Sequence, residues 1–130
     1  MENNKLTFYV VEDSALFQHM IGRLLQPINA QALYFTSGEE AINKLPLHPP
    51  DLVILDYNLD GNMNGLDTLQ VIRRHYPVVY VILFSTRAEI NTAENIQRYG
   101  EFDFVEKNKT GFGVLQQKIN QAVSQFEPGA

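Results

Sequence analysis

Five short, mostly apolar runs constrain the fold of this 130-residue chain more than any other feature of its sequence. Continuous apolar runs, as opposed to alternating ones, are typical of strands buried on both faces of a parallel sheet. The fourth run is almost entirely β-branched or aromatic, and the second is weaker. The expected strands are Leu6–Val11, Ala32–Phe35, Leu52–Leu55, Val78–Phe84 and Phe102–Val105.

Helical patterns fill the stretches between these runs. Apolar residues spaced three or four apart form stripes that each predict a helix with one face toward a core. The last stripe is the clearest, and Pro77 closes the helix of the second. The stripes consist of Phe17, Met20, Ile21 and Leu24; of Leu66, Leu69 and Ile72; and of Leu115, Ile119, Ala122, Val123 and Phe126.

Two further helices are predicted from their ends. Ser37 with Glu40 makes a capping box, which begins a short helix that stops near Pro46. A polar helix is expected over Ala88–Tyr99, with Gly100 as its C-cap. The resulting (βα)5 order places the chain in the α/β class, as a doubly wound five-stranded parallel sheet with helices on both faces.

Polar residues follow four of the strands. The carboxyl ends of parallel strands form the functional crevice in such folds, so these side chains should converge. Adjacent carboxylates repel one another in a partly dry site, and a hard cation such as Mg²⁺ removes that repulsion. One carboxylate can then attack a phosphoryl group whose charge a lysine helps to neutralise. The strand ends carry Glu12 and Asp13, Asp56, Ser85 and Thr86, and Glu106 and Lys107.

These pieces, taken in order, resemble the response regulator receiver family of two-component signalling proteins. The resemblance extends from about Leu6 to Phe126 and implies a flavodoxin-like receiver fold, with residues 1–130 as a single domain and 127–130 as a tail or the start of a linker. The matching pieces are Val10–Asp13, Leu52–Asp56, Phe84–Ser85 and Phe104–Lys107.

The resemblance implies a role for each strand-end residue. Asp56 would be the phosphoacceptor. Glu12 and Asp13 would hold Mg²⁺ together with Asp56 and the backbone carbonyl of Asn58.

The same resemblance implies how phosphorylation is sensed. Ser85 and Lys107 would contact the phosphoryl group, and Ser85 with Phe104 would form the switch that reshapes the face of the fourth helix, fifth strand and fifth helix. Asn58 and Arg87 flank the site at positions that influence the lifetime of the phosphorylated form in relatives.

Partners and location follow from the same family. A sensor histidine kinase or a phosphotransfer protein would donate the phosphoryl group, and a downstream protein or a linked output domain would respond. A homodimer through the switch face is possible in such proteins. The net charge of −5 without a basic run argues against direct nucleic-acid binding, and no apolar run reaches the roughly 18 residues of a membrane span. A cytoplasmic protein is expected, either stand-alone or as a piece of a longer regulator or hybrid kinase.

Four positions depart from the family pattern. Asn108 follows the lysine where proline is usual, which leaves open whether the Lys107–Asn108 peptide is cis or trans. Asp60 replaces a second proline, and the loop from Asn58 to Gly65 is one residue longer than usual. Phe104 lacks the hydroxyl of the common tyrosine. These changes concern the fine structure and the switch more than the chemistry.

The sequence is compatible with three alternatives to a phosphorylated receiver. The stretch Asp56-x-Asn58-x-Asp60-Gly61, with Asp67 at its twelfth position, resembles an EF-hand calcium loop, but it follows a strand. A haloacid-dehalogenase-like phosphatase would need a second aspartate where Asn58 stands. A receiver fold that is inert in phosphorylation is the third.

Overall fold

The computed structural model describes residues 5–86, 88 and 102–126. The predicted polar helix after Ala88, the Gly100 cap, Arg87 and residues 127–130 lie outside the described residues.

Five parallel strands form one sheet in the order β2-β1-β3-β4-β5. This order is that of the flavodoxin-like doubly wound fold, so the predicted fold class is confirmed. The strands are β1 (Leu6–Val11), β2 (Ala30–Phe35), β3 (Leu52–Leu55), β4 (Tyr80–Ser85) and β5 (Asp103–Glu106).

Both bounds of β5 and the end of β4 lie one residue later than predicted, and the starts of β4 and β2 differ by two residues for a physical reason. β4 begins at Tyr80 rather than Val78, because Val78 lies in the turn before the sheet and is 94% exposed. A β-branched residue outside the ladder gains nothing from its strand propensity. β2 begins at Ala30, two residues earlier than the apolar run suggested, because pairing with β1 starts at Leu6 and Ala30.

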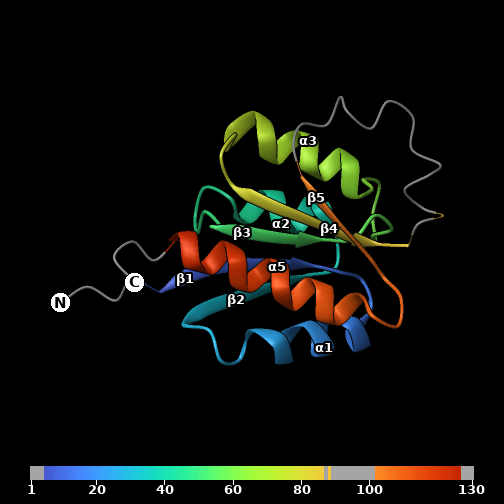
Figure 1. Ribbon diagram of the computed structural model, residues 1–130. Coiled ribbons are helices and arrows are strands. Elements are labelled where there is room, and N and C mark those ends of the chain that lie inside the picture. Colours follow the sequence, from blue (N-terminus) through green and yellow to red (C-terminus); the bar gives the residue numbers. More distant parts are fainter. Residues whose placement is uncertain (1–4, 87, 89–101, 127–130) are drawn as a thin grey trace.

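Helices cover both faces of the sheet (Figure 1), and alternate residues of each strand supply the two cores. In β1, Phe8 and Val10 pack against α1 and α5, whereas Tyr9 and Val11 pack against α2 and α3. The helices with described residues are α1 (Ala15–Leu25), α2 (Gly38–Lys44), α3 (Gly65–His75) and α5 (Gly111–Phe126).

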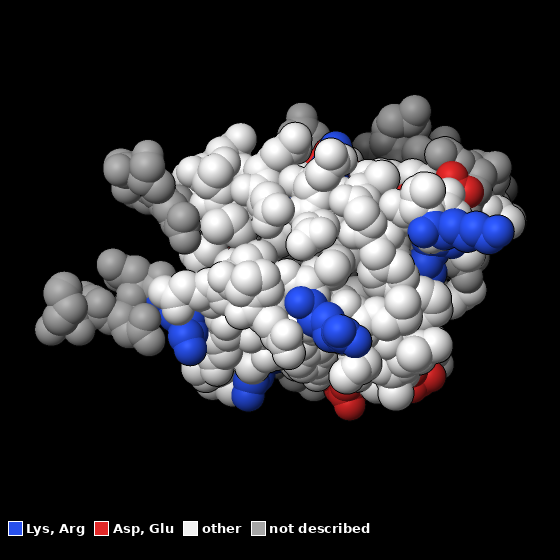
Figure 2. All heavy atoms as spheres, turned by 60° about the horizontal axis from the view of Figure 1, so that its bottom comes forward, with Lys and Arg blue, Asp and Glu red and all other residues white. Residues whose placement is uncertain are grey.

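The predicted helical stripes face these cores. Ile21 of α1, Leu69 and Ile72 of α3, and Leu115 and Ile119 of α5 are fully buried. The outer sides of α1 and α5 carry few charged residues, and Figure 2 shows most of the face in view free of Lys, Arg, Asp and Glu side chains.

Side chains cap the starts of three helices. Ser14 caps α1, Ser37 caps α2 as predicted, and Asn64 caps α3. The capping box predicted for α2 is only half formed, because the Glu40 carboxylate accepts a hydrogen bond from the backbone N–H of Thr36, at 3.2 Å, one residue before the cap.

Among the residues that the structure describes, no helix combines the length and the apolar character that crossing a membrane requires.

Candidate functional site at the carboxyl ends of the strands

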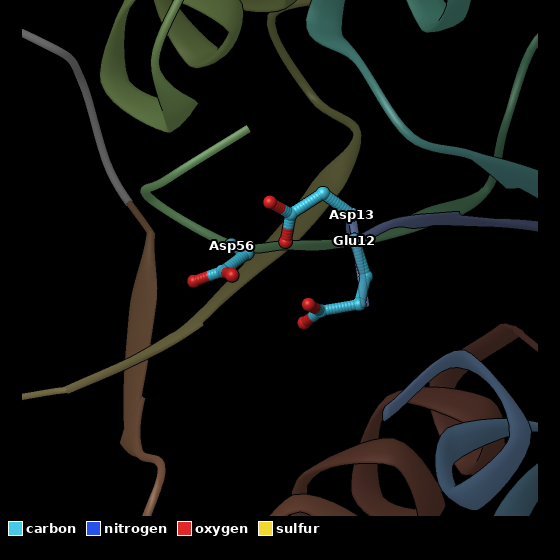
Figure 3. A group of neighbouring side chains, drawn as sticks. All are labelled: Glu12, Asp13 and Asp56. Atoms are coloured by element: carbon cyan, nitrogen blue, oxygen red, sulfur yellow. The ribbon is translucent and has the colours of Figure 1, made fainter. Parts of the chain in front are cut away.

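Three carboxylates gather where β1 and β3 end. One carboxylate oxygen from each of Glu12, Asp13 and Asp56 lies within 4.8 Å of the others. The alignment of Val11 with Leu55 sets the two acidic segments side by side, and the Asp56 N–H donates to the Val11 carbonyl at 3.0 Å. Figure 3 shows the three carboxyl groups turning toward a common space.

The three carboxylates differ in exposure. Glu12 is 2% exposed and Asp56 is 4% exposed, whereas Asp13 is exposed. The cluster therefore has two desolvated charges beneath one that faces solvent. Buried charges are stable only when they are paired or coordinate a metal.

Lys107 supplies a positive charge to the two buried carboxylates. Its ammonium nitrogen lies 2.9 Å from Glu12 Oε1 and 2.9 Å from Asp56 Oδ2. The backbone of Lys107 is held at the end of β4, where its N–H donates to the Ser85 carbonyl at 2.8 Å. The ammonium pairs with two of the three carboxylates and Asp13 is the third, so the cluster keeps a net negative charge that suits a divalent cation.

Further donors hold the Asp56 carboxylate. The backbone N–H of Tyr57 donates to Oδ1 at 2.7 Å, and the hydroxyl of the fully buried Ser85 donates to the same carboxylate. The structure thus brings together the hydroxyl, the ammonium and the acids that the sequence placed at separate strand ends.

Burial shifts the proton affinities of this cluster. Burial, with help from the Asp56 charge, raises the pKa of Glu12 to about 7 against the opposing effects of Lys107 and the Ser14 N–H. Burial also raises the pKa of Asp56, although Lys107, Tyr57 and Ser85 oppose it. Burial alone would lower the pKa of Lys107, but its hydrogen bonds to the two carboxylates outweigh that effect and raise it. Perturbed groups clustered in this way are typical of functional sites.

Hydrogen bonds from two of its backbone N–H groups hold the loop between β3 and α3 in place. The Asp60 N–H donates to the Thr36 carbonyl at 3.1 Å, and the Asn62 N–H donates to Glu39 of α2 at 2.9 Å. Gly61, between them, has a φ of +86°, which favours glycine.

This arrangement disfavours the calcium-loop interpretation. Asp67 accepts a hydrogen bond from the Asn64 N–H at 3.1 Å as part of the α3 capping box. Neither Asp60 nor Asp67 belongs to the acidic group formed by the described residues. Asp56, moreover, follows a strand, whereas an EF-hand loop follows a helix.

The structure shows the conformation and contacts of Asn108 and Phe104, two of the positions that depart from the family pattern. The Lys107–Asn108 peptide is trans, since the described residues contain no cis bond. The Asn108 side chain accepts hydrogen bonds from the N–H and hydroxyl of Thr110, at 3.1 and 3.2 Å, just before α5 begins. Phe104 is partly buried and packs on the core between the sheet and α2 and α3.

One neighbour of the site was missed. The ammonium of Lys107 lies 4.3 Å from the centre of the Phe17 ring. The sequence interpretation assigned Phe17 only to the buried stripe of its helix. Its place four residues after Asp13, in the first turn after the acidic pair, is the signal that could have indicated a role near the site.

Comparison with known proteins identifies the class of domain. The family model described as response regulator receiver domain matches residues 8–120. The chain therefore belongs to the response regulator receiver domain family of two-component signalling.

Its relatives are considerably longer proteins. The chain is 32% identical over 99 residues to an NtrX-like response regulator of Rickettsia bellii, covering 75% of this chain and 21% of that protein. It is 32% identical over 98 residues to the luminescence regulatory protein LuxO of Vibrio campbellii, with the same coverage of 75% and 21%. The chain thus spans about a fifth of the length of the relatives it matches.

Solved structures agree with this assignment. The receiver domain of NtrX from Brucella abortus superposes with a TM-score of 0.77 at 25% identity, covering 90% of this chain and 98% of that one. The N-terminal domain of a response regulator, sensory box and GGDEF three-domain protein from Carboxydothermus hydrogenoformans has the same fold, with a TM-score of 0.79 at 24% identity, covering 92% and 95%.

Proposed function

We propose that this domain accepts a phosphoryl group on Asp56 from a phosphohistidine partner in a Mg²⁺-dependent step. One observation carries the proposal. The Asp56 carboxylate lies at a strand end within 2.9 Å of the Lys107 ammonium and beside two further acids, Glu12 and Asp13. These are the groups that phosphoryl transfer to a carboxylate requires.

The transfer is a displacement at phosphorus. A carboxylate oxygen of Asp56 forms the new P–O bond while the P–N bond of the phosphohistidine breaks, and the departing imidazole keeps the electron pair and takes up a proton. Lys107 offsets the charge on the phosphoryl oxygens, and the Ser85 hydroxyl donates to one of them. Hydrolysis of the acyl phosphate by water returns Asp56 to its free form.

The acidic cluster fits the cation that receiver domains bind. Glu12, Asp13 and Asp56, with the backbone carbonyl of Asn58, would hold Mg²⁺, which prefers oxygen ligands including one or two carboxylates. Bound Mg²⁺ supplies positive charge that offsets the charge of the phosphoryl oxygens. The raised pKa values of Glu12 and Asp56 support this assignment, because desolvated carboxylates gain most from a cation.

Phosphorylation would then act as a switch. A phosphoryl group adds roughly −1.5 to −2 charges and strong acceptor oxygens. Its oxygens would take over the contacts that Ser85 and Lys107 now make with the Asp56 carboxylate, and Phe104 would fill any space that Ser85 leaves as it follows the phosphoryl group. The change would bias the face of β5 and α5 toward a downstream protein, a linked output domain or a second copy of the chain.

The wider setting follows the family. Residues 1–130 form one receiver domain in this proposal and act in the cytoplasm, within two-component signalling. The donor is a sensor histidine kinase or a phosphotransfer protein.

The test uses beryllofluoride, which imitates a phosphoryl group on an aspartate. Amide NMR should show saturable shifts at Asp56, Ser85 and Lys107, extending to Phe104, only when Mg²⁺ is present. Asp56→Asn should remove the response while keeping the fold. If the Asp56→Asn variant still became phosphorylated in an acid-labile, Mg²⁺-dependent way, Asp56 would not be the phosphoacceptor.

Two other outcomes would favour the alternatives. Shifts restricted to residues 56–67 with Ca²⁺ alone would favour the calcium loop. No response to Mg²⁺, Ca²⁺ or beryllofluoride would leave an inert receiver fold that acts through static contacts.

A further inference from the structure

We propose that Phe17 is a positioning residue whose ring face holds the Lys107 ammonium beside Glu12 and Asp56. The inference rests on the proposed function, since it concerns how the lysine of that site is kept in place. The ammonium nitrogen of Lys107 lies 4.3 Å from the Phe17 ring centre, within the range of a cation–π contact.

The Lys107 side chain has two anionic contacts and two aromatic contacts, and the ring of Phe17 is the nearer of the two rings. It is 11% exposed, and its nitrogen lies 2.9 Å from an oxygen of Glu12 and 2.9 Å from an oxygen of Asp56. The ring of Phe84 lies farther away, at 5.8 Å. Because a lysine side chain is long and flexible, a fixed ring beneath the ammonium reduces the number of positions that it can adopt.

Phe17 is itself held in place. Its backbone N–H donates to the Ser14 hydroxyl at 3.3 Å, in the capped first turn of α1. Its ring stacks on Phe112 of α5, with centroids 5.8 Å apart and planes 10° apart. Both rings meet Phe84 of β4 edge-on, at 6.4 Å for Phe17 and 5.2 Å for Phe112. Such separations are those of favourable aromatic pairs.

Three elements therefore meet beneath the ammonium. The aromatic trio of Phe17, Phe84 and Phe112 joins α1, β4 and α5 at the end of the sheet where the acids lie. The trio gives the Lys107 ammonium an apolar, electron-rich support in addition to its two carboxylate partners. Phe17 should therefore affect phosphoryl binding without touching the phosphoryl group.

The decisive variant keeps the shape of the ring. Pentafluorophenylalanine in place of Phe17 retains an aromatic ring while withdrawing the negative charge of its face. Phe17→Leu removes the ring altogether. Phe126→Leu is the matched control, because Phe126 is a partly buried phenylalanine of the same core at the opposite end of α5.

Two measurements are made on each variant: the affinity for beryllofluoride with Mg²⁺, and the rate at which the ¹⁵N-labelled Lys107 ammonium protons exchange with water. We expect both Phe17 replacements to weaken beryllofluoride binding about three- to tenfold and to speed the exchange of the ammonium protons. The reason is that, of the two ring contacts, only the more distant one with Phe84 would remain. The affinity of Phe126→Leu for beryllofluoride should stay within about twofold of the wild-type affinity, which is the change expected from losing the weakest cation–π contacts.

Equal affinity and equal exchange in the fluorinated variant and the wild type would overturn the proposal. If Phe17→Leu does not fold, the fluorinated variant alone decides whether Phe17 positions Lys107. If the wild type itself fails to bind beryllofluoride, the proposed function fails, and the exchange rates still decide whether Phe17 holds Lys107.

Discussion

At the scale of single residues, one lysine offsets the charge of two buried carboxylates in the site. Lys107 lies between Glu12 and Asp56, both of which are almost fully desolvated. An uncompensated buried carboxylate is far less stable than a paired one, so the lysine contributes to folding as well as to the proposed chemistry.

Replacing this lysine tests the balance. Lys107→Ala at pH 8 without Mg²⁺ should lower the free energy of unfolding by on the order of 3 kcal/mol, because two buried carboxylates lose their cation. Lys118→Ala is the control: its partner Asp103 is 3.7 Å away and both side chains are over a third exposed, so the loss should be about 1 kcal/mol or less. Urea denaturation measures both, and equal losses would contradict the assigned role of Lys107.

At the scale of elements, the close approach of β3 and α3 orients the loop beside Asp56. A Cβ atom on Gly65 would lie 2.1 Å from the Asp56 carbonyl oxygen, closer than any real contact. Glycine at the start of α3 therefore lets the helix begin directly against the strand end that carries the proposed phosphoacceptor.

Adding a methyl group at this point should disturb both the fold and the site. Gly65→Ala is expected to lower the free energy of unfolding by about 1–3 kcal/mol, because the backbone on both sides must move. Gly113→Ala in α5, where nothing lies within 4 Å of the new atom, should be neutral or stabilise by up to about 1 kcal/mol. Denaturation with urea compares the two, and a harmless Gly65→Ala would show that the contact at Asp56 relaxes freely.

At the scale of the whole molecule, the acidic cluster links folding to pH and to metal. The pKa of Glu12 rises from an ordinary 4.5 to about 7 in the folded state, and the pKa of Asp56 is raised as well. Between pH 4.5 and about 7, the folded state therefore binds more protons than the unfolded chain. The free energy of unfolding falls as pH rises through this range.

The consequence is a melting temperature that depends on pH and on Mg²⁺. Without Mg²⁺, the domain should melt several degrees lower at pH 8 than at pH 5.5, and Glu12→Gln should flatten this dependence. Mg²⁺ should raise the melting temperature more at pH 8, where protons no longer compete for the carboxylates. Thermal melts followed by circular dichroism measure this, and a slope that Glu12→Gln leaves unchanged would contradict the role of Glu12.

Much of this could be predicted because it depends on local patterns. The bounds of β1 and β3 match the apolar runs Leu6–Val11 and Leu52–Leu55, since a strand buried on both faces is apolar along nearly its whole length. The convergence of Glu12, Asp56 and Lys107 followed from parallel strands ending at one edge. The exposure of Val78, by contrast, depends on where the neighbouring strands begin, which a single run does not reveal.

The sequence by itself determined the α/β class, the order of most elements and the set of polar groups at the strand ends. Local periodicity carries that information, because a side chain's spacing along the chain decides which face it occupies. Only the tertiary structure decided that Lys107 bonds both buried acids, that Asp67 caps α3, and that Phe17 lies under the ammonium. Those contacts join residues from separate elements, so they depend on strand register and helix packing, which no local stretch of sequence encodes.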